Sequence, residues 1–132
     1  MHIIPSLAAE TSLVNSFQEH QDVAGAYHNI GYVYNAQGDY EKALQYLETA
    51  LTIRLKVHGE NHRKTADSYN LMGTVYSNLG NYDKALGYYN KALLIRESVL
   101  GKNDTDTINT RQKIAEIQSK LKELENEQKN EE

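Results

Sequence analysis

The chain has 132 residues, enough for one domain with a buried core, and no cysteine, which excludes disulfides, thiolate metal sites and cysteine nucleophiles. Its net charge is −4 with a pI of about 5.7, which argues against the basic surface that sequence-independent nucleic-acid binding needs. No apolar run approaches the ~20 residues of a membrane span, and the N-terminus lacks the basic and apolar regions of a signal peptide. We therefore expect a cytoplasmic protein that binds neither nucleic acid nor membrane.

An internal repeat organises the sequence. Residues 24–65 align with residues 66–107 at an offset of 42, with identity at 19 of the 42 positions. The single proline, Pro5, precedes both copies, so the chain can be helical over almost its whole length. The identical pairs include Tyr27/Tyr69, Gly31/Gly73, Tyr34/Tyr76, Gly38/Gly80, Tyr40/Tyr82, Ala43/Ala85, Ala50/Ala92, Ile53/Ile95 and Gly59/Gly101.

The first part of each copy has helical periodicity. In the first copy, Tyr27, Ile30, Gly31 and Tyr34 follow the spacing i, i+3, i+4, i+7, which predicts an amphipathic helix whose buried stripe includes the tyrosines. A glycine within that stripe costs about 1 kcal/mol of helix propensity relative to alanine, and a close approach of a second helix would justify the cost. Gly38, followed by Asp39, is expected to end this helix and begin the next.

The second part of each copy predicts a second helix. Its apolar positions are Tyr40, Ala43, Leu44, Leu47, Ala50, Leu51 and Ile53. Arg54 lies in its last turns, where a cation suits the helix dipole, and Gly59 closes it. Each copy is then helix A, tight turn, helix B and loop. Such pairs bury their faces only by stacking, so the predicted fold is all-α, an α-solenoid with two full repeats.

The flanking segments fit the same period. Residues 6–17 fit a degenerate helix B of an upstream repeat, and residues 104–126 fit a third helix A. We therefore divide the chain into an N-terminal cap (1–20), a first repeat (21–61), a second repeat (62–103), a capping helix (104–126) and a frayed polar tail (127–132).

These positions resemble the tetratricopeptide repeat. The spacing of Tyr27, Ile30, Gly31, Tyr34, Ala43, Leu47 and Ala50 is similar to its pattern W/Y-x2-L-G-x2-Y followed by A-x3-F/L-x2-A. The second copy matches at Tyr69, Met72, Gly73, Tyr76, Ala85, Tyr89 and Ala92. The 42-residue period and the stretches "ALTIRLKVHGENH" and "ALLIRESVLGKND" resemble the kinesin-light-chain-like subclass, although Arg63 and Thr105 stand where that subclass has proline.

The resemblance implies a non-catalytic scaffold that binds a peptide or helix of a partner protein in a concave groove lined by helices A. The positions beside the buried stripe are the predicted groove residues: His28, Asn29, Tyr32, Asn35, Asp67, Asn70, Thr74, Ser77, Asn78, Gln112, Lys113 and Glu116. Asparagine can donate to and accept from a peptide backbone, and tyrosine offers a flat amphipathic contact.

The carboxylate clamp by which some tetratricopeptide domains hold chaperone C-termini is not expected. Its Lys and Asn positions correspond here to His28 and Tyr32, then Leu71, then Asn109 and Lys113. Lys113 alone retains a cation, so a terminal carboxylate would lose most of its charge-assisted bonds.

Catalytic and metal sites are also not expected. The glycines occur singly rather than in a phosphate-binding loop, and Ser68 and Ser77 have no evident base. The stretch "HGENH" places His58 and His62 at a zinc-ligand spacing, but Gly59 should break the helix and remove their shared face. His62 matches Asp104 of the next unit and is instead expected to cap a helix A. No cofactor is expected.

Self-association is the alternative function. Solenoids usually need about three or more repeats with atypical caps, and this chain has two complete ones. An open helix face at one end would bind a second copy of the chain, with or without exchange of helices. Alternatively, the chain is a fragment of a longer array, in which further repeats cover that face.

Overall fold

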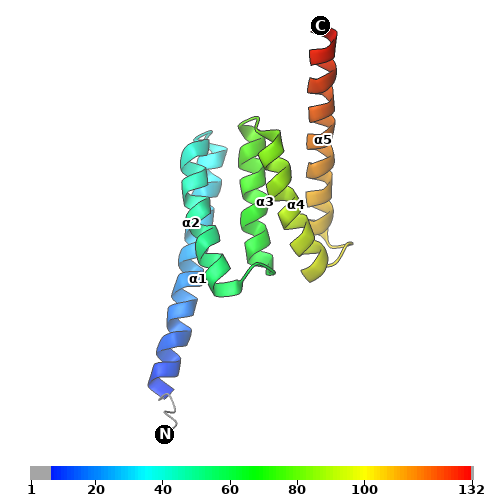
Figure 1. Ribbon diagram of the computed structural model, residues 1–132. Coiled ribbons are helices and arrows are strands. Elements are labelled where there is room, and N and C mark those ends of the chain that lie inside the picture. The colour runs from blue at the N-terminus through cyan, green and yellow to red at the C-terminus, as the bar shows by residue number, and fades with distance from the viewer. Residues whose placement is uncertain (1–6, 132) are drawn as a thin grey trace.

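The computed structural model describes the backbone of residues 7–131 and the side chains of residues 20–131. This range forms the helices α1 (Leu7–Ala36), α2 (Tyr40–His58), α3 (Arg63–Asn78), α4 (Tyr82–Val99) and α5 (Thr105–Glu131), and contains no strand. Figure 1 shows consecutive helices running antiparallel as pairs that stack side by side. The predicted all-α solenoid is confirmed.

The tight turns within the repeats form as their residues predict. Gly38 has φ 84°, a conformation that favours glycine, and the Asp39 amide donates to the Tyr34 carbonyl at 2.9 Å. The Asp39 side chain then accepts from the Lys42 amide at the start of α2. Gly80 and Asn81 form the same turn before α4. Each turn returns helix B along its own helix A.

The helix glycines lie where two helices approach closely. A Cβ atom at Gly31 would lie 2.8 Å from Leu47 Cγ of α2, and one at Gly73 would lie 2.8 Å from Tyr89 Cδ1 of α4. Contacts this short do not occur between real Cβ atoms and their neighbours. The close approach that the sequence required of these glycines is therefore present.

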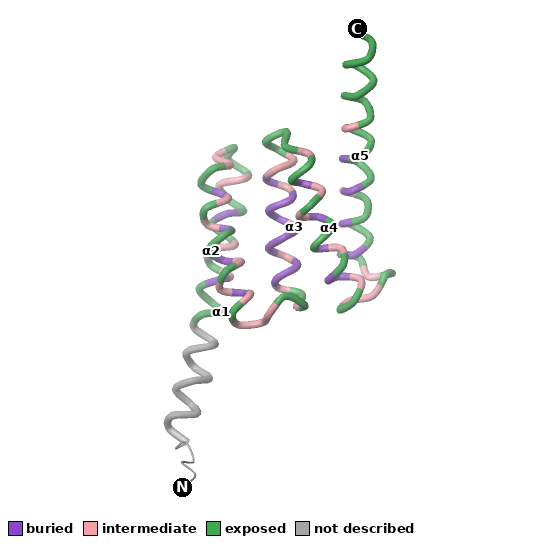
Figure 2. The backbone as a smooth tube through the Cα atoms, in the orientation of Figure 1, coloured by how far each residue is buried: buried purple, intermediate pink, exposed green. Residues whose placement is uncertain are grey.

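The core runs from one helix pair to the next. Ala43 and Leu47 of α2 pack with Leu71, Met72 and Val75 of α3 in one cluster. Two further clusters join α3 to α4 and α4 to α5. Figure 2 shows buried positions along most of α3, which has neighbours on both sides, whereas α5 is exposed over its C-terminal half.

Tyrosines fill the space between helices A and B. The rings of Tyr34 and Tyr46 stack with centroids 5.5 Å apart, and Tyr76 and Tyr88 repeat the arrangement at 5.4 Å. Tyr69 is buried in the α3–α4 cluster. These tyrosines therefore serve packing.

The expected helix boundary near residues 18–21 is wrong. Instead of a helix B over 6–17 and a separate helix A, α1 runs without a break from Leu7 to Ala36. No proline or glycine lies between residues 7 and 24, so nothing in the local sequence stops the helix. Residues 1–6 lie outside the described part.

The C-terminal helix is longer than expected. α5 was expected to end near residue 126 but continues to Glu131, so the predicted polar tail is helical in the structure up to that residue. Residue 132 lies outside the described part. Ile114 and Ile117 of α5 are buried as expected for a third helix A. Ala115, which corresponds to Gly73, is exposed because no described helix B covers it.

Candidate partner-binding face

The predicted groove residues come from helices α1, α3 and α5, and none of them is buried. Asn29, Tyr32, Asn78, Gln112 and Glu116 are exposed, and Tyr32 is the most accessible large apolar residue among the described side chains of α1, at 61%. The others are half-buried: His28, Asn35, Asp67, Asn70, Thr74, Ser77 and Lys113. We name the surface formed by these exposed and half-buried residues the A face.

Hydrogen bonds between helices A hold the A face together. The Asn78 Nδ2 atom of α3 donates to Asn35 Oδ1 of α1 at 3.0 Å. Thr110 Oγ1 of α5 donates to Asn70 Oδ1 of α3 at 3.3 Å. These contacts place α1, α3 and α5 side by side, although neighbours in this layer are separated in sequence by a helix B.

A further polar chain links α5, α3 and α4. Lys113 Nζ donates to Thr74 Oγ1 at 3.4 Å, and Thr74 Oγ1 shares a 2.7 Å hydrogen bond with Tyr89 Oη. Burial, opposed by the bond to Thr74, raises the pKa of Tyr89, so its hydroxyl remains protonated. Several predicted groove residues therefore already have partners within the fold, and Asn29, Tyr32, Gln112 and Glu116 stay accessible above them.

One buried arginine from each helix B, Arg54 of α2 and Arg96 of α4, joins that helix to the A face. Arg96 donates to Thr110 Oγ1 at 2.7 Å and, through Nη2, to Asp67 Oδ1 at 3.0 Å. Arg54 donates to Ser68 Oγ at 2.9 Å and to His28 Nδ1 at 3.0 Å. These contacts were not predicted from the sequence, where the place of Arg54 in the last turns of helix B indicated only an interaction with the helix dipole.

The signal that could have shown this role is the repeat itself. An arginine recurs at 54 and 96, and a hydroxyl residue recurs 14 positions later at Ser68 and Thr110. A cation and a hydroxyl that recur together at the repeat offset indicate a contact repeated between helix B and the following helix A rather than a solvated charge.

The contact with Arg54 fixes the state of His28. Because arginine is always a donor, His28 Nδ1 must accept, and the imidazole is neutral. Burial, followed by the nearby Arg54, lowers the pKa of His28 to about 4, against an opposing effect of Asp67. His28 therefore carries no charge on the A face at neutral pH.

The stretch "HGENH" forms the junction between the repeats. His62 is the N-cap of α3, since its Nδ1 accepts from the Lys64 amide at 3.0 Å, as predicted. Gly59 ends α2 with φ 81°, as predicted, but it does not separate the two histidines. The turn brings His62 back against His58, and their rings stack with centroids 3.9 Å apart.

The surroundings of the two histidines are those of a packed junction. Burial, followed by the neighbouring His62, lowers the pKa of His58. Burial, followed by the hydrogen bond that Tyr69 Oη donates to Glu60 at 2.9 Å, raises the pKa of Tyr69 to about 12. Among the residues that the structure describes, no three His, Cys, Asp or Glu side chains are grouped to hold a metal ion.

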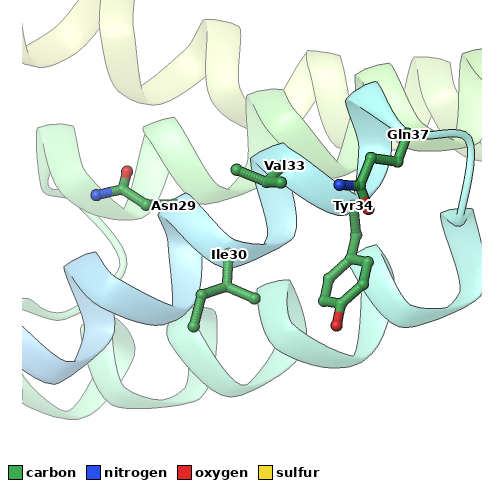
Figure 3. A pocket seen from close by; sticks show the side chains of 5 residues that line it. All are labelled: Asn29, Ile30, Val33, Tyr34 and Gln37. Carbon is green, nitrogen blue, oxygen red and sulfur yellow. The ribbon is translucent and has the colours of Figure 1, made fainter.

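An apolar pocket lies on α1 itself. It has a volume of about 360 Å³ and is lined by Asn29, Ile30, Val33, Tyr34 and Gln37, all shown in Figure 3. Ile30 and Val33 are 39% and 49% exposed, whereas their equivalents in α3 are fully buried. In α3 these positions are covered by α2, and no described helix covers them in α1.

Stacked antiparallel helix pairs at a 42-residue period define the protein as a helical-repeat solenoid. A family model described as tetratricopeptide repeat matches residues 22–93 and again residues 68–129. The chain therefore belongs to the tetratricopeptide repeat family. No curated protein matches its sequence. No helix in the described range is long and apolar enough to cross a membrane.

Proposed function

We propose that the protein is a non-catalytic scaffold whose A face binds a peptide or helix of a partner protein. Repeats of this family generally mediate contacts between proteins. The observation that carries the proposal for this chain is the layer of α1, α3 and α5. Hydrogen bonds fix that layer from within, while polar side chains of each helix, and Tyr32 of α1, remain accessible on it.

The accessible side chains suit a peptide. Asn29 and Gln112 can each donate to and accept from a backbone amide. Tyr32 offers a large aromatic surface with a hydroxyl at its edge, and tyrosine is enriched in protein interfaces. Because the supporting residues are already hydrogen-bonded, the face needs little reordering on binding, which lowers the entropic cost.

The test is a selection of peptides from a random displayed library, followed by measurement of their affinities for variants by calorimetry. Tyr32→Ala and Gln112→Ala should each weaken binding, with about a thirtyfold loss for Tyr32→Ala if it is a hot spot. The control is Leu94→Ala, since Leu94 of α4 is 71% exposed and belongs to a helix B. Equal losses in Leu94→Ala and Tyr32→Ala would contradict the proposal.

The period and the "ALTIR" and "ALLIR" stretches support the finer proposal that the chain belongs to the kinesin-light-chain-like subclass. A cytoplasmic location is part of the same proposal. Fluorescence imaging of the tagged protein checks the location, and signal confined to another compartment would contradict it.

Self-association is a second candidate, favoured by the open apolar face of α1. Val23, Ile30 and Val33 are all exposed there. The equivalent face of α3 is covered by a helix, so α1 has the shape to accept one. The occupant we propose is α1 of a second copy, which would bury both faces in one two-fold contact. Light scattering at micromolar concentration should then give a dimer mass that Val33→Glu reduces to a monomer mass. A monomer mass for the unaltered chain would contradict it.

A further inference from the structure

Arg54 and Arg96 occupy equivalent places in the two repeats, and their contacts can be compared atom by atom. They are 5% and 7% exposed. Nη1 of each donates to a hydroxyl of the following helix A, Ser68 for Arg54 and Thr110 for Arg96. Nη1 of each also donates to a backbone carbonyl one turn earlier. The two guanidinium groups share these two contacts, and Nη1 of Arg54 also donates to His28 Nδ1 at 3.0 Å, a bond that Arg96 lacks.

The two sites differ in their carboxylate. Nη2 of Arg96 donates to Asp67, which closes a salt bridge at 3.0 Å. The residue that corresponds to Asp67 in the first repeat is Gly25. Among the described residues, no ion pair joins a carboxylate to Arg54, and the hydrogen bonds of its guanidinium all run from Nη1, to His28, Lys64 and Ser68. The repeat therefore shows where a carboxylate belongs, and the first repeat does not supply it.

The place of the missing carboxylate is open. A pocket of about 430 Å³ is lined by Gln21, Asp22, Gly25, Ala26, Asn29, Arg54 and Lys64. A Cβ atom built on Gly25 would meet nothing within 4 Å. Two cations and one carboxylate line the pocket, and the carboxylate, on Asp22, is exposed and not paired with Arg54. Asn29 belongs both to this pocket and to the A face, so the two are continuous.

We infer that this pocket binds a carboxylate of the partner peptide, which accepts from Arg54 as Asp67 accepts from Arg96. The inference deepens the proposed function and rests on it, since the peptide on the A face supplies the carboxylate. It differs from the carboxylate clamp, which the sequence does not predict here, because its cation comes from a helix B.

The energetics favour an anion at this place. A guanidinium that the fold has already buried has lost much of its hydration, and burial lowers the pKa of Arg54 despite the opposing effect of Asp67. A carboxylate that reaches it forms a charge-assisted hydrogen bond without a further cost of burying the cation. Lys64 adds a second positive charge at the pocket wall.

The test uses small probes, so it does not depend on finding the partner. The Nε–H signals of the arginines are followed by NMR while N-acetylglutamate N-methylamide, N-acetylglutamine N-methylamide or N-acetylalanine is added. The two acids carry a side-chain and a terminal carboxylate. We expect a saturable shift of the Arg54 signal with a carboxylate probe. The acid that binds more tightly shows whether the pocket prefers a side-chain or a terminal carboxylate. No shift with either acid, or an equal shift with the neutral glutamine probe, would overturn the inference.

A matched pair of variants locates the site. Gly25→Asp supplies the carboxylate from within and should weaken carboxylate binding at least about tenfold. Gly87→Asp makes the same change in charge at another helix position with nothing within 4 Å, and should leave binding unchanged. Equal effects of the two variants would overturn the inference.

Failure of the inference and failure of the proposed function are distinguishable. Probes that bind at Arg54 support the pocket even if library peptides do not depend on Tyr32. Library peptides that depend on Tyr32 support the proposed function, and they leave the pocket refuted if no carboxylate shifts Arg54.

Discussion

Replacing Gly73 by alanine tests the close approach of helix A and helix B. The added methyl would lie 2.8 Å from Tyr89 Cδ1, 2.9 Å from Cε1 and 3.0 Å from Cγ. The ring cannot easily move away, because Tyr89 is almost fully buried and its hydroxyl is bonded to Thr74 at 2.7 Å. The clash must then be relieved by a shift of α4 against α3.

Two effects of opposite sign set the magnitude. Overpacking a core by one methyl costs about 1–3 kcal/mol. Replacing glycine by alanine inside a helix raises the free energy of unfolding by about 1 kcal/mol through helix propensity. Gly73→Ala should therefore lower the free energy of unfolding by about 1 kcal/mol, since the clash is with a fixed ring. Gly87→Ala, in α4 with open space around it, should instead raise that free energy by about 0.5–1 kcal/mol.

The assay is urea unfolding followed by circular dichroism at 222 nm, with both variants measured beside the unaltered chain. We expect Gly87→Ala to be more stable than Gly73→Ala by about 2 kcal/mol. A Gly73→Ala variant as stable as Gly87→Ala would refute the reasoning, because the propensity gain would then be unopposed at both sites.

Three further predictions follow from the polar contacts and the last helix. Because burial lowers the pKa of His28 to about 4, the unfolded chain takes up a proton first as pH falls below 6.5. The free energy of unfolding then falls between pH 6.5 and about 4, by at most about 3 kcal/mol. His28→Asn, which introduces the residue found at the equivalent position 70, should remove this pH-dependent loss, as measured by urea titrations at pH 7 and pH 4.5. Asp67→Asn should cost about 2 kcal/mol in the same assay, since it leaves buried Arg96 without its carboxylate, and an unchanged midpoint would contradict the pairing. Amides of residues 127–131 should exchange hydrogen without measurable protection, because every side chain there is exposed, and protection equal to that of α3 would contradict fraying.

The sequence predicts the helix pairs because local chemistry and the repeat agree. Gly31 and Gly73 are unfavourable within a helix unless a partner helix lies against them, so their presence at equivalent positions indicates the packing. His62 is identified as a cap by its alignment with Asp104, and its side chain takes that role. Such features depend on near neighbours in sequence or on the repeat offset alone.

The features that were missed depend on contacts between distant side chains. Arg54 reaches His28, which lies 26 positions earlier, and periodicity cannot show which residues meet across the layer. The stacking of His58 on His62 depends on how far Gly59 turns the chain. The continuous α1 was missed because the repeat offset implied a boundary that the local sequence lacks.

The most direct test of the central claim maps a library-selected peptide on the protein by amide NMR shifts. Binding at the A face predicts that shifts gather on α1, α3 and α5, around Tyr32, Asn70 and Gln112. Shifts confined to the exposed surface of α2 and α4, around Leu94, would contradict the claim that helices A bind the partner.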